Sequence, residues 1–148
     1  MSIDGVTTCL WFDGQAEDAV QFYVATFPGS TIVSTSYYPT DAQRPEGSVL
    51  TVEFELFGRP FLALNGGPQY AHSHAISFQV FCDTQEEVDR LWDALVSNGG
   101  EESMCGWCSD RFGVSWRSSR GGFLSCSQVQ MLKWLVSRRS ACSPCARS

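Results

Sequence analysis

Two glutamates on one segment are the residues of this chain best placed for acid–base chemistry. Glu53 and Glu55 lie in residues 48–57, where polar and apolar residues alternate as in a half-buried strand. Side chains two positions apart in a strand point to the same face, so we expect both glutamates to share a face with Thr51. If that face lines a cavity, Glu53 and Glu55 are candidate catalytic residues for proton transfer. If it meets water, they only increase solubility, which is the simpler interpretation.

Two pairs of cysteines have the spacing of zinc knuckles and redox centres. Cys105 and Cys108, and again Cys142 and Cys145, are separated by two residues. A redox pair gains a low thiol pKa at a helix N-terminus, whereas Cys105 precedes a turn and a predicted strand. A four-thiolate zinc site would require the end of the chain to fold back onto its body. We therefore interpret Cys105 as a small buried residue.

Aromatic side chains are concentrated on the predicted strands. In a curved sheet alternate residues face the interior, so several of them could line an apolar pocket for a flat ligand. The pocket candidates are Trp11, Phe12, Phe54, Phe61, Trp107 and Trp116. Packing in an ordinary core is the alternative for each of them. The tryptophans of the last strands are the strongest candidates.

The elements that must position these residues occur twice along the chain. Residues 9–23 and 78–92 each read as an apolar strand, a turn with Asp and Gln, an acidic pair and a helix with a bulky aromatic residue. The first half is predicted to form strands and a helix at residues 6–12, 16–27, 31–38, 48–57 and 60–64. The second half is predicted to form them at residues 75–82, 85–97, 103–108 and 114–116, with Asp110 and Arg111 in a turn rather than in a catalytic pair.

Charge and composition limit the classes of function. Residues 1–116 contain all sixteen acidic residues and four basic ones, whereas residues 117–148 contain six basic residues and no acidic one. An acidic body argues against nucleic acid as a partner. No segment approaches the roughly 18 apolar residues that span a bilayer, and no secretion signal is evident. We expect a cytoplasmic protein without a membrane partner, in which the seven cysteines are free thiols.

Three of these segments together resemble a known family. They are the Trp-Phe-Asp-Gly-Gln-Ala-Glu-Asp-Ala stretch at residues 11–19, the helix at residues 83–92, and the Cys-Gly-Trp and Asp-Arg-Phe-Gly-Val-Ser-Trp stretches within residues 105–116. They look like the PhnB-like family of the glyoxalase/bleomycin-resistance/extradiol-dioxygenase (vicinal oxygen chelate) superfamily, whose members often bear the description 3-demethylubiquinone-9 3-methyltransferase. The resemblance implies an α+β fold of paired βαβββ modules, about residues 5–67 and 74–116. Such modules form a cupped mixed sheet, usually in a homodimer.

The resemblance also indicates where a metal ion would bind. Many superfamily members hold one divalent ion, with ligands at positions that correspond roughly to Thr8, Ala63, Ile76 and Arg117. None of these is the imidazole or carboxylate that such an ion prefers. His74 lies two residues before one of these positions and is a weak metal candidate, for which an exposed loop histidine is the alternative. We therefore expect no metal and no cofactor.

The resemblance and the aromatic residues together suggest that the protein binds a small organic molecule in an apolar cup without a metal. Aromatic molecules are among the expected ligands. One alternative is an enzyme, either a metal-dependent lyase or dioxygenase or the methyltransferase of the family description. The other is a nonenzymatic protein that sequesters a drug. A methyltransferase that uses S-adenosylmethionine usually needs a glycine-rich loop after a first strand, and the chain has no G-x-G-x-x-G motif.

The resemblance ends at Trp116, where relatives would continue with a Gln-Ile-Val-Pro-like strand and an acidic helix. Residues 117–148 are instead rich in Ser, Arg and Cys. We hypothesise that this segment is translated in a shifted reading frame, with a natural basic tail as the alternative. An intact frame across codons 116–118 in independent isolates would contradict the hypothesis.

Overall fold

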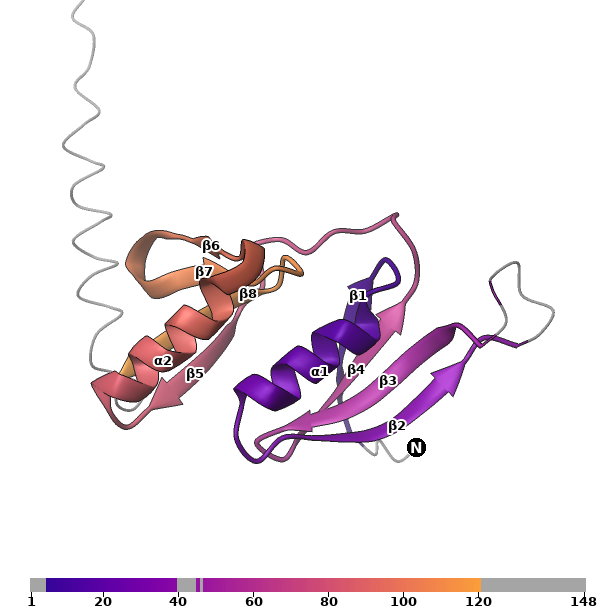
Figure 1. Cartoon of the computed structure of the whole chain (residues 1–148), viewed down its shortest axis with the longest axis horizontal. Coiled ribbons are helices and arrows are strands. Elements are labelled where there is room, and N and C mark those ends of the chain that lie inside the picture. Colours follow the sequence, from indigo (N-terminus) through magenta and orange to yellow (C-terminus); the bar gives the residue numbers. More distant parts are fainter. Residues whose placement is uncertain (1–4, 40–44, 46, 121–148) are drawn as a thin grey trace, which may run out of the picture. The chain divides into compact units, whose positions relative to one another are not determined.

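The computed structural model of the protein describes residues 5–39, 45 and 47–120, which Figure 1 draws as a coloured ribbon. The chain divides into two compact units, Met1–Ser73 and His74–Ser148. Each unit contains a four-stranded mixed sheet and one α-helix that packs against it. Within the described residues, no helix is long and apolar enough to cross a bilayer.

The first unit folds as a strand, a helix and three further strands. Its elements are β1 (Thr8–Phe12), α1 (Ala16–Thr26), β2 (Thr31–Tyr37), β3 (Val49–Leu56) and β4 (Arg59–Asn65). The order in the sheet is β1-β4-β3-β2, with β1 parallel to β4 and the other neighbours antiparallel. Each element lies within two residues of its predicted bounds at either end.

The second unit repeats this connectivity. Its elements are β5 (Phe78–Cys82), α2 (Gln85–Val96), β6 (Glu101–Glu102), β7 (Trp107–Ser109) and β8 (Ser115–Arg120). The order is β5-β8-β7-β6, again with the first strand parallel to the last and with antiparallel pairs beyond it. Both units are therefore βαβββ modules, and the predicted α+β fold class is confirmed.

Two predicted strands of the second unit are shorter in the structure. β5 begins at Phe78 because its pairing with β8 begins there, opposite Trp116, and Ile76 before it is 74% exposed. The strand predicted for residues 103–108 is interrupted by the single 3-10 turn Met104–Gly106, so that only its last part belongs to β7. The left-handed backbone of Gly106, with φ of 76°, redirects the chain into β7.

β8 is longer than the predicted strand, which ends at Trp116. It continues to Arg120 and lies between β5 and β7, so the first residues of the basic tail form a central strand of the second sheet. The predicted boundary between body and tail therefore falls inside an element. The rest of the tail, residues 121–148, lies outside the described residues.

α1 covers one face of the first sheet. Its buried residues recur at steps of three and four, as an amphipathic helix requires, and they are Ala16, Ala19, Val20, Tyr23 and Thr26. The Tyr23 ring stacks on Phe54 at 6.1 Å between centroids, and Phe54 in turn stacks on Phe61 at 5.3 Å. This row of aromatic rings forms the centre of the core of the first unit.

The start of α1 is capped by a residue from a distant strand. Gln15 precedes the helix but makes no side-chain cap. Instead Asn65, at the end of β4 and 5% exposed, accepts a hydrogen bond from the Ala16 amide at Oδ1 over 2.9 Å. Its Nδ2 donates to the Val49 carbonyl over 3.0 Å. One buried amide side chain therefore connects α1, β3 and β4.

We expect Asn65→Ala to lower the free energy of unfolding by about 2 kcal/mol, because it leaves a buried amide and a buried carbonyl without partners. Chemical denaturation followed by circular dichroism measures this loss. Gln15→Ala is the matched control, because the Gln15 side chain makes no capping bond, and it should change stability by less than about 0.5 kcal/mol. Equal losses in the two variants would contradict the role assigned to Asn65.

Candidate functional site

Each sheet has one face covered by its own helix and one face that this helix leaves uncovered. Strand residues alternate between the two faces, so the register assigns every candidate to one of them. Phe12, Phe54 and Phe61 are 3%, 1% and 9% exposed and point to the side of α1. These three residues therefore belong to the ordinary core and do not form the wall of a pocket.

Trp116 belongs to the corresponding core of the second unit, where it is 2% exposed. Its ring lies 5.3 Å from Phe78, and its indole Nε1 donates to Asp110 Oδ2 over 2.7 Å. Oδ1 of the same carboxylate accepts the Phe112 and Val114 amides over 2.8 and 3.1 Å. Asp110 thus organises the turn before β8, which confirms the turn predicted at this position.

The uncovered face of the first sheet contains two adjacent rows of side chains that cross neighbouring strands. The first row is Trp11, Leu64 and Thr51; the second is Cys9, Leu62, Glu53 and Ser34. Neighbouring strands are about 4.8 Å apart, so each row is a continuous surface. We call these seven residues the Trp11 face. Its apolar part is Trp11 with Leu62 and Leu64, and its polar part lies on β3 and β2.

Trp11 is held in a fixed orientation on this face. Its Nε1 donates to the Gly67 carbonyl over 2.7 Å, and the Tyr70 ring meets it edge-on at 5.1 Å and 82°. Gly66 packs directly against the indole, since a Cβ at Gly66 would overlap the Trp11 ring. Half-buried and fixed on one side, the indole offers a preorganised flat surface.

The two candidate glutamates lie on the uncovered side of β3 with Thr51, as the alternation predicts. Ser34 Oγ donates to Glu53 Oε2 over 2.9 Å. Glu53 is exposed and Glu55 is half-buried. Glu53 can therefore accept hydrogen bonds from a ligand at the polar end of the Trp11 face.

The residues at the positions implied for a metal do not fit a divalent ion. Ala63 is fully buried under α1, and its neighbours on the Trp11 face, Leu62 and Leu64, have no donor atom. Thr8 is exposed on β1, and Arg117 is a cation. His74 Nδ1 lies 3.1 Å from Ser115 Oγ. Within residues 5–39, 45 and 47–120, no three His, Cys, Asp or Glu side chains are grouped as metal ligands.

The structure bears on one cysteine of the pair at residues 105 and 108. Cys108 is fully buried on the side of α2. Desolvation raises the pKa of its thiol to about 11, and the carboxylates of Asp110 and Glu102 add to the increase. A neutral buried thiol is a poor nucleophile and metal ligand. The side chain of Cys105 and both cysteines of the pair at residues 142 and 145 lie outside the described part of the chain.

The uncovered face of the second sheet is more polar than the Trp11 face. Arg117 on β8 is in register with Trp107 on β7 and Gln79 on β5, and its guanidinium carbon lies 5.5 Å from the centre of the Trp107 ring. Of the two strongest pocket candidates, Trp107 is thus on an uncovered face and Trp116 is not.

The alternation within each strand was visible in the sequence, but the face that each helix covers was not. For this reason Leu62, Leu64 and Gln79 were missed.

Comparison with solved structures supports the fold class. The chain resembles a glyoxalase/bleomycin resistance protein from Albidiferax ferrireducens T118, at 14% identity and a TM-score of 0.51 over 80% of this chain and 98% of that one. It also resembles the fosfomycin resistance protein FosX from Listeria monocytogenes, at 17% identity and a TM-score of 0.54 over 82% and 96% of the two chains. The fold is therefore that of the glyoxalase/bleomycin-resistance proteins.

The family follows from two stronger similarities. The model of the family described as 3-demethylubiquinone-9 3-methyltransferase matches residues 4–118. A PhnB protein from Bacillus cereus is 32% identical, with a TM-score of 0.73 over 80% of this chain and all of that chain. Comparison with proteins of curated function gives no match. The chain belongs to the PhnB-like, 3-demethylubiquinone-9 3-methyltransferase family.

Proposed function

We propose that the protein binds a small organic molecule on the Trp11 face and does so without a resident metal ion. The single observation that carries the proposal is the fixed indole of Trp11, which lies beside Leu62 and Leu64 on the side of the sheet that α1 does not cover. Rigid aromatic surface next to aliphatic side chains is typical of sites for flat apolar ligands.

The polar residues of the Trp11 face would determine how a bound ligand is oriented. Glu53 and its hydrogen-bond partner Ser34 lie at one side of the apolar residues, across β3 and β2. A ligand with a flat apolar part over Trp11 and a hydroxyl or amine group toward Glu53 would satisfy both regions. Covering about 60 Å² of apolar surface contributes roughly 1.5 kcal/mol, about tenfold in affinity.

Binding of neutral planar compounds tests this proposal. We expect a panel that includes 1-naphthamide to give at least one ligand by calorimetry, and Trp11→Ala to weaken its binding by about tenfold or more. Trp92→Phe is the control, because it also removes one indole but lies on α2 in the other unit. Undiminished binding by Trp11→Ala, or an equal loss in Trp92→Phe, would refute the proposed site.

Metal analysis distinguishes this proposal from the metal-dependent lyase or dioxygenase. A stoichiometric divalent ion in the purified protein would favour the enzyme. Recovery of the bound ligand chemically unchanged would favour simple binding or drug sequestration over catalysis. We also propose a homodimer, which light scattering after size-exclusion chromatography would detect.

A further inference from the structure

We infer that Asn98 is a site of spontaneous covalent modification, in which the side-chain amide is lost as ammonia and the main chain acquires an isoaspartyl linkage. The chain contains two asparagines, Asn65 and Asn98, and each of them is followed by two glycines. Because the two Asn-Gly-Gly segments are identical in sequence, a difference in their reactivity has to come from the fold. The inference does not depend on the function proposed for the Trp11 face.

The reaction needs no enzyme and takes place within one Asn-Gly pair. The main-chain nitrogen of the glycine attacks the side-chain Cγ of the asparagine, so that a C–N bond forms and the bond from Cγ to Nδ2 breaks. Nδ2 leaves as ammonia with the proton of the glycine amide. Water then opens the resulting succinimide ring, mostly to isoaspartate and otherwise to aspartate. Glycine favours the ring closure because it has no Cβ to obstruct it.

The fold protects Asn65 from this reaction. The nitrogen that would attack, the Gly66 amide, donates a hydrogen bond to the Phe12 carbonyl over 3.0 Å. The Asn65 side chain is held at both ends, since Oδ1 accepts the Ala16 amide over 2.9 Å and Nδ2 donates to the Val49 carbonyl over 3.0 Å. Asn65 is also 5% exposed, so water has little access to a succinimide at this position. Ring closure at Asn65 therefore requires three hydrogen bonds to break.

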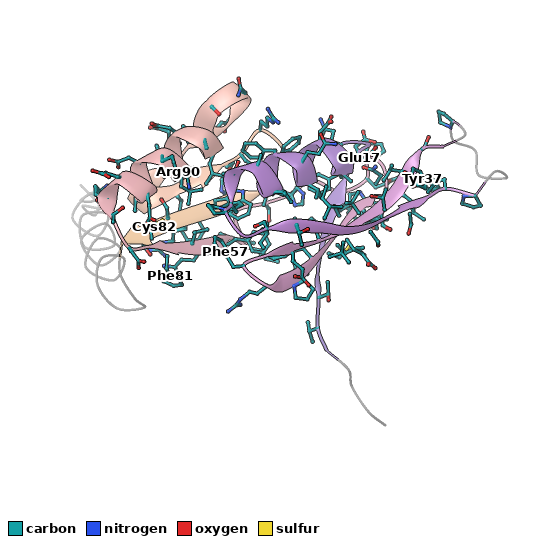
Figure 2. The ribbon with its side chains drawn as sticks, turned by 60° about the horizontal axis from the view of Figure 1, so that its bottom comes forward. Glu17, Tyr37, Phe57, Phe81, Cys82 and Arg90 are labelled. Carbon is teal, nitrogen blue, oxygen red and sulfur yellow. The ribbon has the colours of Figure 1, made fainter. Side chains whose placement is uncertain are left out.

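Asn98 lies on an exposed turn beyond the end of α2. In Figure 2, α2 runs from near Cys82 past Arg90, and the 3-10 turn Ser97–Gly99 follows its far end. The Asn98 side chain is exposed, and its Nδ2 donates to Ser97 Oγ over 3.4 Å, which is longer than an ordinary hydrogen bond. Water therefore reaches the amide, and this long surface bond restrains it only weakly.

The main chain around Asn98 has room for the ring closure. The Gly99 nitrogen approaches Cγ through a rotation about ψ of Asn98, which is 34° in the structure. Gly99 can take up the change, because glycine adopts most backbone conformations and, among the described residues, an added Cβ there would meet only Arg111 Cβ at 3.8 Å. Asn98 has a left-handed backbone, with φ of 56°, so leaving this conformation costs little.

The modification would act on the contact between α2 and β7. An isoaspartyl linkage brings Cβ of residue 98 into the main chain and so lengthens the path from Val96 to Gly100. Gly100 packs so closely that an added Cβ would lie 2.7 Å from Val96 Cα and 2.9 Å from the Ser109 carbonyl oxygen. The new carboxylate also lies near the end of α2, where the helix dipole is negative. We therefore expect the modified protein to open locally more often and to be digested by a protease about tenfold faster.

Ageing of the full-length folded protein tests the inference. Peptide mapping by mass spectrometry, with fragmentation that separates isoaspartate from aspartate, measures the loss of each amide. We expect Asn98 to react at least about a hundredfold faster than Asn65, mainly to isoaspartate. The rate should rise with pH, because the attacking amide must lose its proton. In urea the two segments should react at similar rates. Gly99→Ala, which places a methyl group beside the attacking nitrogen, should slow the reaction at Asn98 and leave Asn65 unchanged.

Three results would overturn the inference. They are equal rates at the two asparagines of the folded protein, an Asn98 that stays intact in the folded protein while it reacts in urea, and a product that is aspartate without isoaspartate. Asn98→Asp is the control for the effect on α2 and β7, because it adds the carboxylate without lengthening the main chain. Equal digestion of Asn98→Asp and of the aged protein would contradict the effect assigned to the isoaspartyl linkage.

Discussion

Replacing Gly100 by alanine is expected to lower the free energy of unfolding by about 3 kcal/mol or more. A Cβ at this position would lie 2.7 Å from Val96 Cα and 2.9 Å from the Ser109 carbonyl oxygen, and closer still to the Leu95 carbonyl. All three obstacles are backbone, so no side chain can rotate away. The end of α2 and the β6–β7 pair would have to separate, which denaturation of Gly100→Ala measures.

The adjacent glycine provides the control. Gly99 has φ of 106°, which favours glycine, but an added Cβ there meets only Arg111 Cβ at 3.8 Å. Gly99→Ala should therefore cost about 1 kcal/mol from backbone strain alone. A loss of unfolding free energy in Gly100→Ala that is no greater than in Gly99→Ala would contradict the close approach of the α2 and β7 backbones at Gly100.

Asp110→Ala is expected to cost about 3 kcal/mol, because one carboxylate that is 2% exposed satisfies three donors. Alanine would leave the amides of Phe112 and Val114 and the indole of Trp116 without their acceptors. The loss should appear as a lower denaturant midpoint with an unchanged slope. A loss below about 1 kcal/mol would show that water replaces the carboxylate.

A double-mutant cycle isolates the bond between Asp110 and Trp116. Asp110→Asn keeps an acceptor for the two amides but turns an NH₂ group toward the indole N–H, so that two donors face each other. Trp116→Phe removes the indole donor, and Asp110→Asn should then cost about 1 kcal/mol less than in the unsubstituted protein. Additive losses would contradict a direct interaction between the two side chains.

The sequence predicted most of the first unit because its periodicities are unambiguous. α1 begins at the predicted Ala16, and Thr51, Glu53 and Glu55 share a face as expected. Strict alternation would place Val49 on that face as well, but Val49 is 6% exposed. The reason is an irregularity in the β2–β3 register between Ser36 and Tyr37, which shifts the pairing at the start of β3 and cannot be read from alternation.

The candidate site was predicted less well than the fold. Alternation divides a strand into two sets of side chains but does not state which set a helix will cover. Phe54 and Phe61 therefore could not be distinguished from Trp11 before the stacking of Tyr23 on Phe54 was known. On β4 the run of residues 60–64 is apolar throughout, so its pattern concealed that Leu62 and Leu64 belong to the Trp11 face. Long-range packing, which propensity does not encode, decides such cases.

The place of β8 between two partners has a consequence for how such a protein can change over generations. Main-chain hydrogen bonds to β5 and β7 hold this strand, and they make no demand on which side chains project from the side away from α2. The residues at positions 117 and 119 can therefore be substituted, even by an abrupt change of coding sequence, while the main-chain hydrogen bonds of β8 are retained. The side chains on that face can therefore diverge rapidly while the architecture persists.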